Sequence, residues 1–153
     1  MAYRFRFQAL HQYREYLLKR ERIALAQTLQ RLETCERERT QARERLRAES
    51  NRFEQHQCEG MSVPEFLAFG EHIQTLEQRL LELESKALHL RRELESARVR
   101  VMERERDLRA LSVLEEREWE AYRERLKRRQ QKQTDEFAVV ARNRGGEDAD
   151  RSS

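Results

Sequence analysis

The chain contains a single proline and only four glycines, the residues that most often interrupt helices and form tight turns. Charged residues, by contrast, make up 40% of its 153 positions. This balance argues against a globule with a thick core. It favours long solvated helices, each of which buries only a narrow apolar stripe.

Long hydrophobic runs are also missing from the sequence. No stretch of eighteen consecutive apolar residues occurs, and residues 1–20 lack the apolar run that a secretory signal needs. We therefore expect a cytoplasmic protein without a transmembrane segment.

Neither sign of charge is in large excess over the whole chain. Lysine and arginine number 32 against 29 acidic residues, and the two signs are interleaved. Glu33 and Arg37, for example, have the four-residue spacing that supports a helix. This interleaving argues against a general nucleic-acid binder.

Residue patterns typical of metal binding or catalysis are absent from the sequence. The four histidines show no metal-ligand spacing with one another or with Cys35 and Cys58, so we expect them on solvated faces. The two cysteines are 23 positions apart, which is about 35 Å along a helix, and cannot bridge each other. We expect Cys35 to be a small buried side chain and Cys58 to be more exposed. Because no glycine-rich phosphate loop and no strand for a nucleophile is present, we expect no enzymatic activity, cofactor or metal.

An apolar heptad repeat runs from Phe66 to Leu111 in alternating steps of three and four. Its positions are Phe66, Phe69, Ile73, Leu76, Leu80, Leu83, Ala87, Leu90, Leu94, Ala97, Val101, Leu108 and Leu111. Only Arg104 interrupts it, and this side chain either extends its charge into water or pairs with Glu21. The repeat predicts a coiled-coil helix.

A weaker repeat predicts a first helix from about Phe7 to His56. One seven-residue frame contains Leu18, Leu25, Leu32, Leu46 and Phe53, with Arg39 in the vacant place. Other apolar residues that we expect along this helix are Leu10, Tyr13, Leu17, Leu29 and Ala42. Since isolated helices are marginal in water, this helix should depend on the second one for its order.

The turn between the two helices is predicted at residues 57–64, around Gly60. There Ser62 and Glu65 have the spacing of a capping box, and Pro64 falls in the first turn of the second helix. A connection this short makes neighbouring helices antiparallel. We therefore predict an all-α fold, an antiparallel two-helix coiled-coil hairpin with a longer second helix. Its segments are a first helix with a basic aromatic N-terminus (1–56), a turn (57–64), a second helix (65–141) and a disordered tail (142–153).

The open end of this hairpin is predicted to be uneven. With the turn near Gly60, Leu10 should lie level with Leu111, so that about 25 residues of the second helix project beyond the first. After Leu111 the repeat changes its spacing and continues through Glu115 to Trp119, Tyr122 and Leu126, a stutter that locally unwinds the supercoil.

Aromatic residues are expected to close that end. Trp119 and Tyr122 should meet Tyr3, Phe5 and Phe7 in one cluster.

Positive charge is concentrated in only one place. Residues 123–132 hold six cations and one carboxylate, Glu124, and hence carry +5. The cations are Arg123, Arg125, Lys127, Arg128, Arg129 and Lys132. The segment is either a solvated helix end, favoured by the helix dipole, or an electrostatic docking segment for an acidic partner.

Two short motifs resemble a known family. The opening run from Tyr3 to Leu10 reads Tyr-Arg-Phe-Arg-Phe-Gln-Ala-Leu and is followed by Tyr13, Arg14 and Glu15. It resembles the start of the flagellar FliJ family, with Phe7 in place of the usual leucine. Near the other end, Gln131, Lys132, Asp135, Glu136 and Ala138 resemble the closing motif of the family, with Thr134 where an aliphatic residue is more usual.

This resemblance implies a non-enzymatic stalk component of the flagellar type III protein export apparatus. Such a protein is expected to bind the hexameric export ATPase, promote its assembly and activity, and link it to the membrane export gate protein and to export chaperones. It would be cytoplasmic and peripheral to the inner membrane at the flagellar base. The predicted partner-binding residues are Phe5, Phe7, Leu10 and Arg14 from the opening motif, Lys132, Asp135 and Glu136 from the closing motif, and Arg125, Arg128 and Arg129 from charge. For the aromatic residues, closure of the hairpin end is an equally good interpretation.

Four other readings stay open at this point. A stalk protein of a virulence-type secretion system would have the same architecture. A nucleic-acid-binding coiled coil would use the basic segment on phosphates. A spacer would oligomerise through its apolar repeat, and a membrane-surface protein would use its basic aromatic N-terminus.

Overall fold

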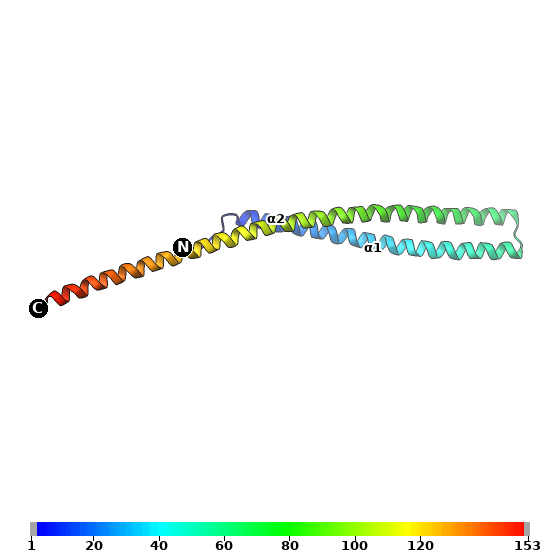
Figure 1. Cartoon of the computed structure of the whole chain (residues 1–153). Coiled ribbons are helices and arrows are strands. Elements are labelled where there is room, and N and C mark those ends of the chain that lie inside the picture. Colours follow the sequence, from blue (N-terminus) through cyan, green and yellow to red (C-terminus); the bar gives the residue numbers. More distant parts are fainter. Residues whose placement is uncertain (1–2, 152–153) are drawn as a thin grey trace. The chain divides into compact units, whose positions relative to one another are not determined.

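The structure, a computed structural model, describes residues 3–151, with the backbone alone for Asp148. It contains two helices, α1 (Gln8–Glu59) and α2 (Val63–Arg151), and no strand among these residues. The chain divides into two units. The hairpin unit is Tyr16–Glu105, and the terminal unit combines residues 3–15 with residues 106–151. The predicted all-α helical hairpin is confirmed (Figure 1).

The connection between the helices is shorter than predicted, because only residues 60–62 lie outside them. Gly60 has a φ of 96°, a left-handed conformation that glycine adopts without the steric penalty of a Cβ. The predicted capping box is present: the Glu65 amide donates to Ser62 Oγ and the Ser62 amide donates to a Glu65 carboxylate oxygen, both at 3.4 Å. These contacts satisfy amide groups that the first turn of α2 leaves without helical partners.

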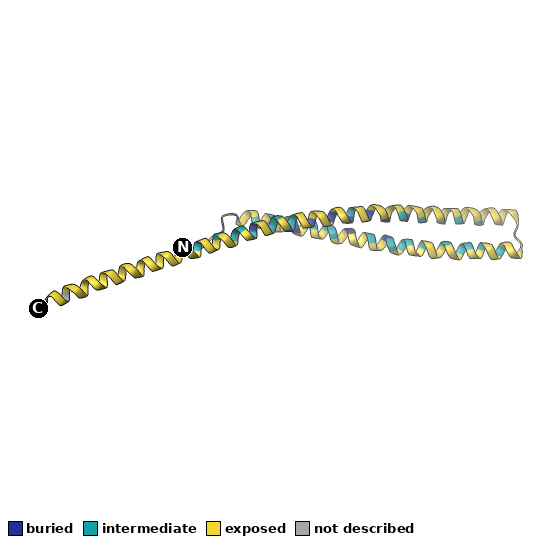
Figure 2. Ribbon diagram, viewed as in Figure 1, coloured by how far each residue is buried: buried dark blue, intermediate teal, exposed yellow. Residues whose placement is uncertain are grey.

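The core of the hairpin unit is a narrow seam along the two helices (Figure 2). The α2 side has Leu83, Ala87, Leu90, Leu94, Ala97 and Val101, all buried, as the heptad repeat predicted. Leu83 is 2% exposed, and Cys35 of α1 packs beside it at 1%. Cys35 is therefore a buried side chain, as expected, and Cys58 is exposed.

The α1 side of the seam differs in part from the prediction. Leu10, Tyr13 and Leu29 are exposed, while Thr28 is buried. Because each helical residue turns by about 100°, the side chain after Thr28 points away from the seam, and Thr28 is aligned with Cys35 seven residues later. The Thr28 hydroxyl donates to the Ala24 carbonyl at 2.9 Å, which satisfies a polar group that would otherwise be costly to bury.

Polar side chains flank the seam and fix its register. Ion pairs at 3.1 Å join the helices of the hairpin unit: Arg22 with Glu105, Arg43 with Glu84, and Arg100 with Glu21. Glu21, which the sequence analysis considered as a partner of Arg104, thus pairs with Arg100. Exposed pairs stabilise a fold by only about 0–1 kcal/mol each, so these contacts specify alignment more than they add stability.

Two histidines differ from the expected solvated placement. His56 is half-buried, with its ring 5.4 Å from that of Phe69, and His11 is half-buried beside Glu15. His72 and His89 are exposed.

The end of α2 also differs from the expectation of a disordered tail. The helix continues through residue 142 to Arg151, and the last two residues of the expected tail lie outside the described part. Extending an existing helix adds a hydrogen bond for each residue that is fixed, whereas starting one is the costly step. Gly145 and Gly146 oppose this by only about 1 kcal/mol each.

No helix in the described part of the chain has the length and apolar character required to cross a bilayer.

Candidate functional site

The candidate site lies in the terminal unit, where the N-terminal segment packs along α2. Arg14 Nη1 donates to the Asp107 carbonyl at 2.8 Å, and Arg6 pairs with Glu118 at 3.5 Å. These contacts place the segment antiparallel to α2, in the register expected from a turn at Gly60. Arg14 is half-buried and therefore also packs its apolar stem against its neighbours, so that it contributes more than a charge.

An aromatic cluster closes this part of the molecule. The Tyr3 ring centroid lies 4.9 Å from Trp119 in an edge-on arrangement and 5.3 Å from Tyr122, and Trp119 and Tyr122 stack at 5.7 Å. Aromatic pairs at these separations stabilise by about 0.5–1.5 kcal/mol beyond the area that they bury. The predicted contact of Tyr3 with the two α2 aromatics is present, whereas Phe5 and Phe7 form their own edge-on pair at 5.9 Å.

The hydroxyl of Tyr3 is buried and has no hydrogen-bond partner among the described residues. Burial raises the pKa of Tyr3 above the ordinary tyrosine value, because ionisation would place a charge in a poorly solvated position. The carboxylates of Glu118 and Glu115 raise this pKa further by repelling a phenolate.

Arg6 is a structural contact that the sequence analysis did not identify. Its guanidinium carbon lies 4.6 Å from the centroid of the Phe7 ring, while the same side chain pairs with Glu118. Alternation of arginine and phenylalanine in the opening motif was the available signal, since guanidinium groups stack on aromatic faces.

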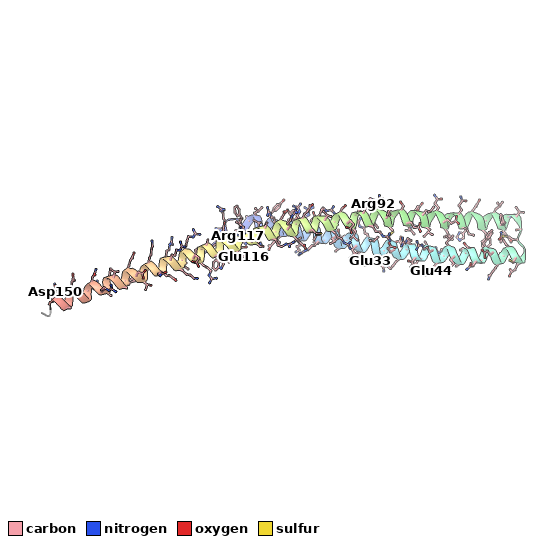
Figure 3. The ribbon with its side chains drawn as sticks, viewed as in Figure 1. Glu33, Glu44, Arg92, Glu116, Arg117 and Asp150 are labelled. Atoms are coloured by element: carbon pink, nitrogen blue, oxygen red, sulfur yellow. The ribbon has the colours of Figure 1, made fainter. Side chains whose placement is uncertain are left out.

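Beyond Tyr122 the helix α2 has no packing partner within the described chain. Every residue from 123 to 151 whose side chain is described is exposed (Figure 2). Figure 3 shows the side chains of this stretch projecting outward, as far as Asp150. Within the basic segment Lys127 pairs with Glu124 at 3.5 Å and Arg125 Nε donates to the Ala121 carbonyl at 3.4 Å.

Six of the predicted contact residues share one face of this exposed stretch. Spacings of three and four residues put them on the same side of a helix. In chain order they are Arg125, Arg128, Arg129, Lys132, Asp135 and Glu136, all exposed. We call this the charged face; it is basic at its start and acidic at its end.

The four predicted contacts from the opening motif are placed differently. Phe5 is 4% exposed, Phe7 and Arg14 are half-buried, and Leu10 is 39% exposed. Phe5 and Arg14 are thus engaged within the terminal unit, which favours hairpin closure as their first role. Leu10 is the most accessible of the four.

Within residues 3–151, no three histidine, cysteine, aspartate or glutamate side chains are grouped so that they could hold a metal ion. The terminal unit instead provides a long exposed helix face that is rich in charge.

Comparison with known proteins identifies the family. The family model described as flagellar FliJ protein matches residues 3–147, so the chain belongs to the FliJ family. Membership makes it a component of the flagellar export apparatus, in a family of export stalk proteins that are not known enzymes. No curated protein and no solved structure matches the chain.

Proposed function

We propose that this chain is the stalk of the flagellar export ATPase, with the exposed end of α2 entering the hexameric ring. The observation that carries the proposal is the exposed stretch after Tyr122, a single helix that presents the charged face. A single helix with its side chains is about 10–12 Å wide, which suits a narrow central opening.

The mechanism requires no catalytic residue from the chain. A protein that binds the assembled hexamer more tightly than free subunits shifts the equilibrium toward the hexamer by that difference in affinity. Since the active sites of a ring ATPase are complete only in the assembled ring, hydrolysis rises with assembly. The cations of the charged face supply long-range attraction and orientation during encounter.

The terminal and hairpin units have separate proposed roles. Contacts with the export gate and with export chaperones are assigned to surfaces outside the charged face, and Leu10 is the most accessible candidate within the opening motif. We assign the hairpin unit a structural role, as a packed coiled coil. Location at the flagellar base, peripheral to the inner membrane, follows from the same proposal.

Charge reversal tests the ATPase contact. Replacing Arg125, Arg128 and Arg129 by glutamate should raise the concentration needed for half-maximal ATPase stimulation by about tenfold or more, because three attractive charges become repulsive. It should also reduce the salt dependence of stimulation. The measurement is the steady-state hydrolysis rate against chain concentration at low and moderate salt.

The matched control reverses three exposed arginines of the hairpin unit, Arg45, Arg47 and Arg92. This variant has the same net charge and should stimulate like the unmodified chain. Equal stimulation by the two variants would remove the charged face from the proposal.

A further inference from the structure

A second feature of the exposed α2 stretch is an apolar stripe beside the charged face. Leu126, Phe137 and Val140 are 41%, 75% and 48% exposed. Steps of four, three, four and three residues join them through Gln130 and Gln133 along one side of the helix. We call these five residues the apolar stripe. In a monomer it faces water over its whole length.

We propose that the apolar stripe binds the apolar stripe of a second copy of this chain, with the two α2 ends antiparallel. In one register of such a pair the two-fold axis passes between Gln131 and Lys132. Leu126 then faces Phe137 of the second copy, and Gln130 faces Gln133, whose amides can donate to and accept from each other. Symmetry makes each contact occur twice.

Charge complementarity supports this occupant and this orientation. In the same register Arg129 lies opposite Glu136 of the second copy, at positions that flank the stripe, and this pair also occurs twice. Residues 123–132, with a charge of +5, lie beside residues 131–140, which hold one lysine and two carboxylates and so carry −1. A parallel pair would instead bring the two basic segments together, with repulsion between like charges.

This pairing has a consequence for partner binding. Arg129 and Glu136 belong to the charged face, so self-association and binding of another protein there exclude one another. The pairing itself does not depend on the proposed stalk role, because it follows from the exposed residues of α2 alone.

The test is sedimentation equilibrium of the full chain over a range of concentrations. The unmodified chain should form a reversible dimer that weakens with added salt. Leu126→Asp combined with Phe137→Asp should leave only monomer. Val139→Asp is the matched control, since Val139 is 58% exposed on the same stretch but lies on the side of the charged face; this variant should dimerise normally.

Orientation is tested by exchanging charges. Arg129→Glu and Glu136→Arg should each raise the dimer dissociation constant by about tenfold, because two exposed pairs become repulsive. The double variant should recover the original value. A chain that stays monomeric at about 0.5 mM, a weak limit for specific association, overturns the proposal. A dimer that still forms after Leu126 and Phe137 are replaced also overturns the proposal. The same holds if the double charge exchange does not restore the original dissociation constant.

Discussion

At the level of single residues, Tyr3 combines two opposing effects. Its ring packs against Trp119 and Tyr122, which stabilises the terminal unit. Its hydroxyl is buried without a hydrogen-bond partner among the described residues, which costs free energy. The raised pKa of Tyr3 reflects the same burial, together with repulsion from Glu118 and Glu115.

We expect Tyr3→Phe to keep the ring contacts and to leave the terminal unit as stable or slightly more stable at neutral pH. Because phenylalanine has no ionisable hydroxyl, the variant should also lack the loss of stability that Tyr3 causes at alkaline pH. Below the ordinary tyrosine pKa of about 10, Tyr3 is neutral in the folded and unfolded chains. The packing of Tyr3 then contributes fully to the stability of the terminal unit. Above it the unfolded chain releases the proton first, so stability falls as the pH rises through the raised folded pKa.

The measurement is urea unfolding followed by emission of Trp119, the only tryptophan, at neutral pH and at a pH above about 10. The difference between the two pH values should be larger for the unmodified chain than for Tyr3→Phe. An equal difference would show that the Tyr3 hydroxyl does not contribute.

At the level of the helices, the seam of the hairpin unit is the main source of stability. Leu83 and Leu81 of α2 illustrate its narrowness, because they are two positions apart but 2% and 66% exposed. Burial of one leucine side chain stabilises by about 1.5–3 kcal/mol, so the positions of the seam matter individually.

Leu83→Ala should lower the free energy of unfolding by about 2–5 kcal/mol, from lost burial and the cavity beside Cys35. Leu81→Ala makes the same chemical change on the outer side of α2 and should cost less than about 0.5 kcal/mol. Thermal unfolding followed by circular dichroism measures both. Similar losses at the two positions would contradict the assigned seam.

Much of this architecture could be predicted from the sequence because a heptad repeat and one turn determine it. The repeat after Phe66 identified the buried side of α2, and the capping box at Ser62 marked where α2 begins. The apolar repeat did not predict that Thr28 is buried, because threonine is not counted as apolar. Thr28 nevertheless lies on the same buried side of α1 as Cys35.

The remaining differences arise where local signals are weak. Leu29 is one of the apolar residues of the first helix but is exposed, because the irregular repeat of α1 allows more than one frame. The spacing of the charged face was enough to locate its residues on one side of a helix. The burial of Phe5, in contrast, depends on tertiary packing that no local pattern determines. Phe137 and Val140 were missed as part of a stripe because two glutamines separate them from Leu126.

At the level of the whole chain, the net charge of +3 conceals a strongly uneven distribution. The hairpin unit interleaves its charges as ion pairs across the seam, whereas the basic segment of the terminal unit is exposed. The basic segment is therefore open to solvent. Membership in the FliJ family makes the chain a component of flagellar protein export.

The central claim is that the chain promotes assembly of the export ATPase by binding the ring. The most direct test adds the purified chain to the export ATPase of the same cell, at a concentration where the ATPase is mostly unassembled, and measures hydrolysis and hexamer formation in the same samples. We predict that both increase together as the chain is added and reach a plateau at the same concentration. Hydrolysis and hexamer content that stay unchanged at every concentration of the chain would contradict the claim.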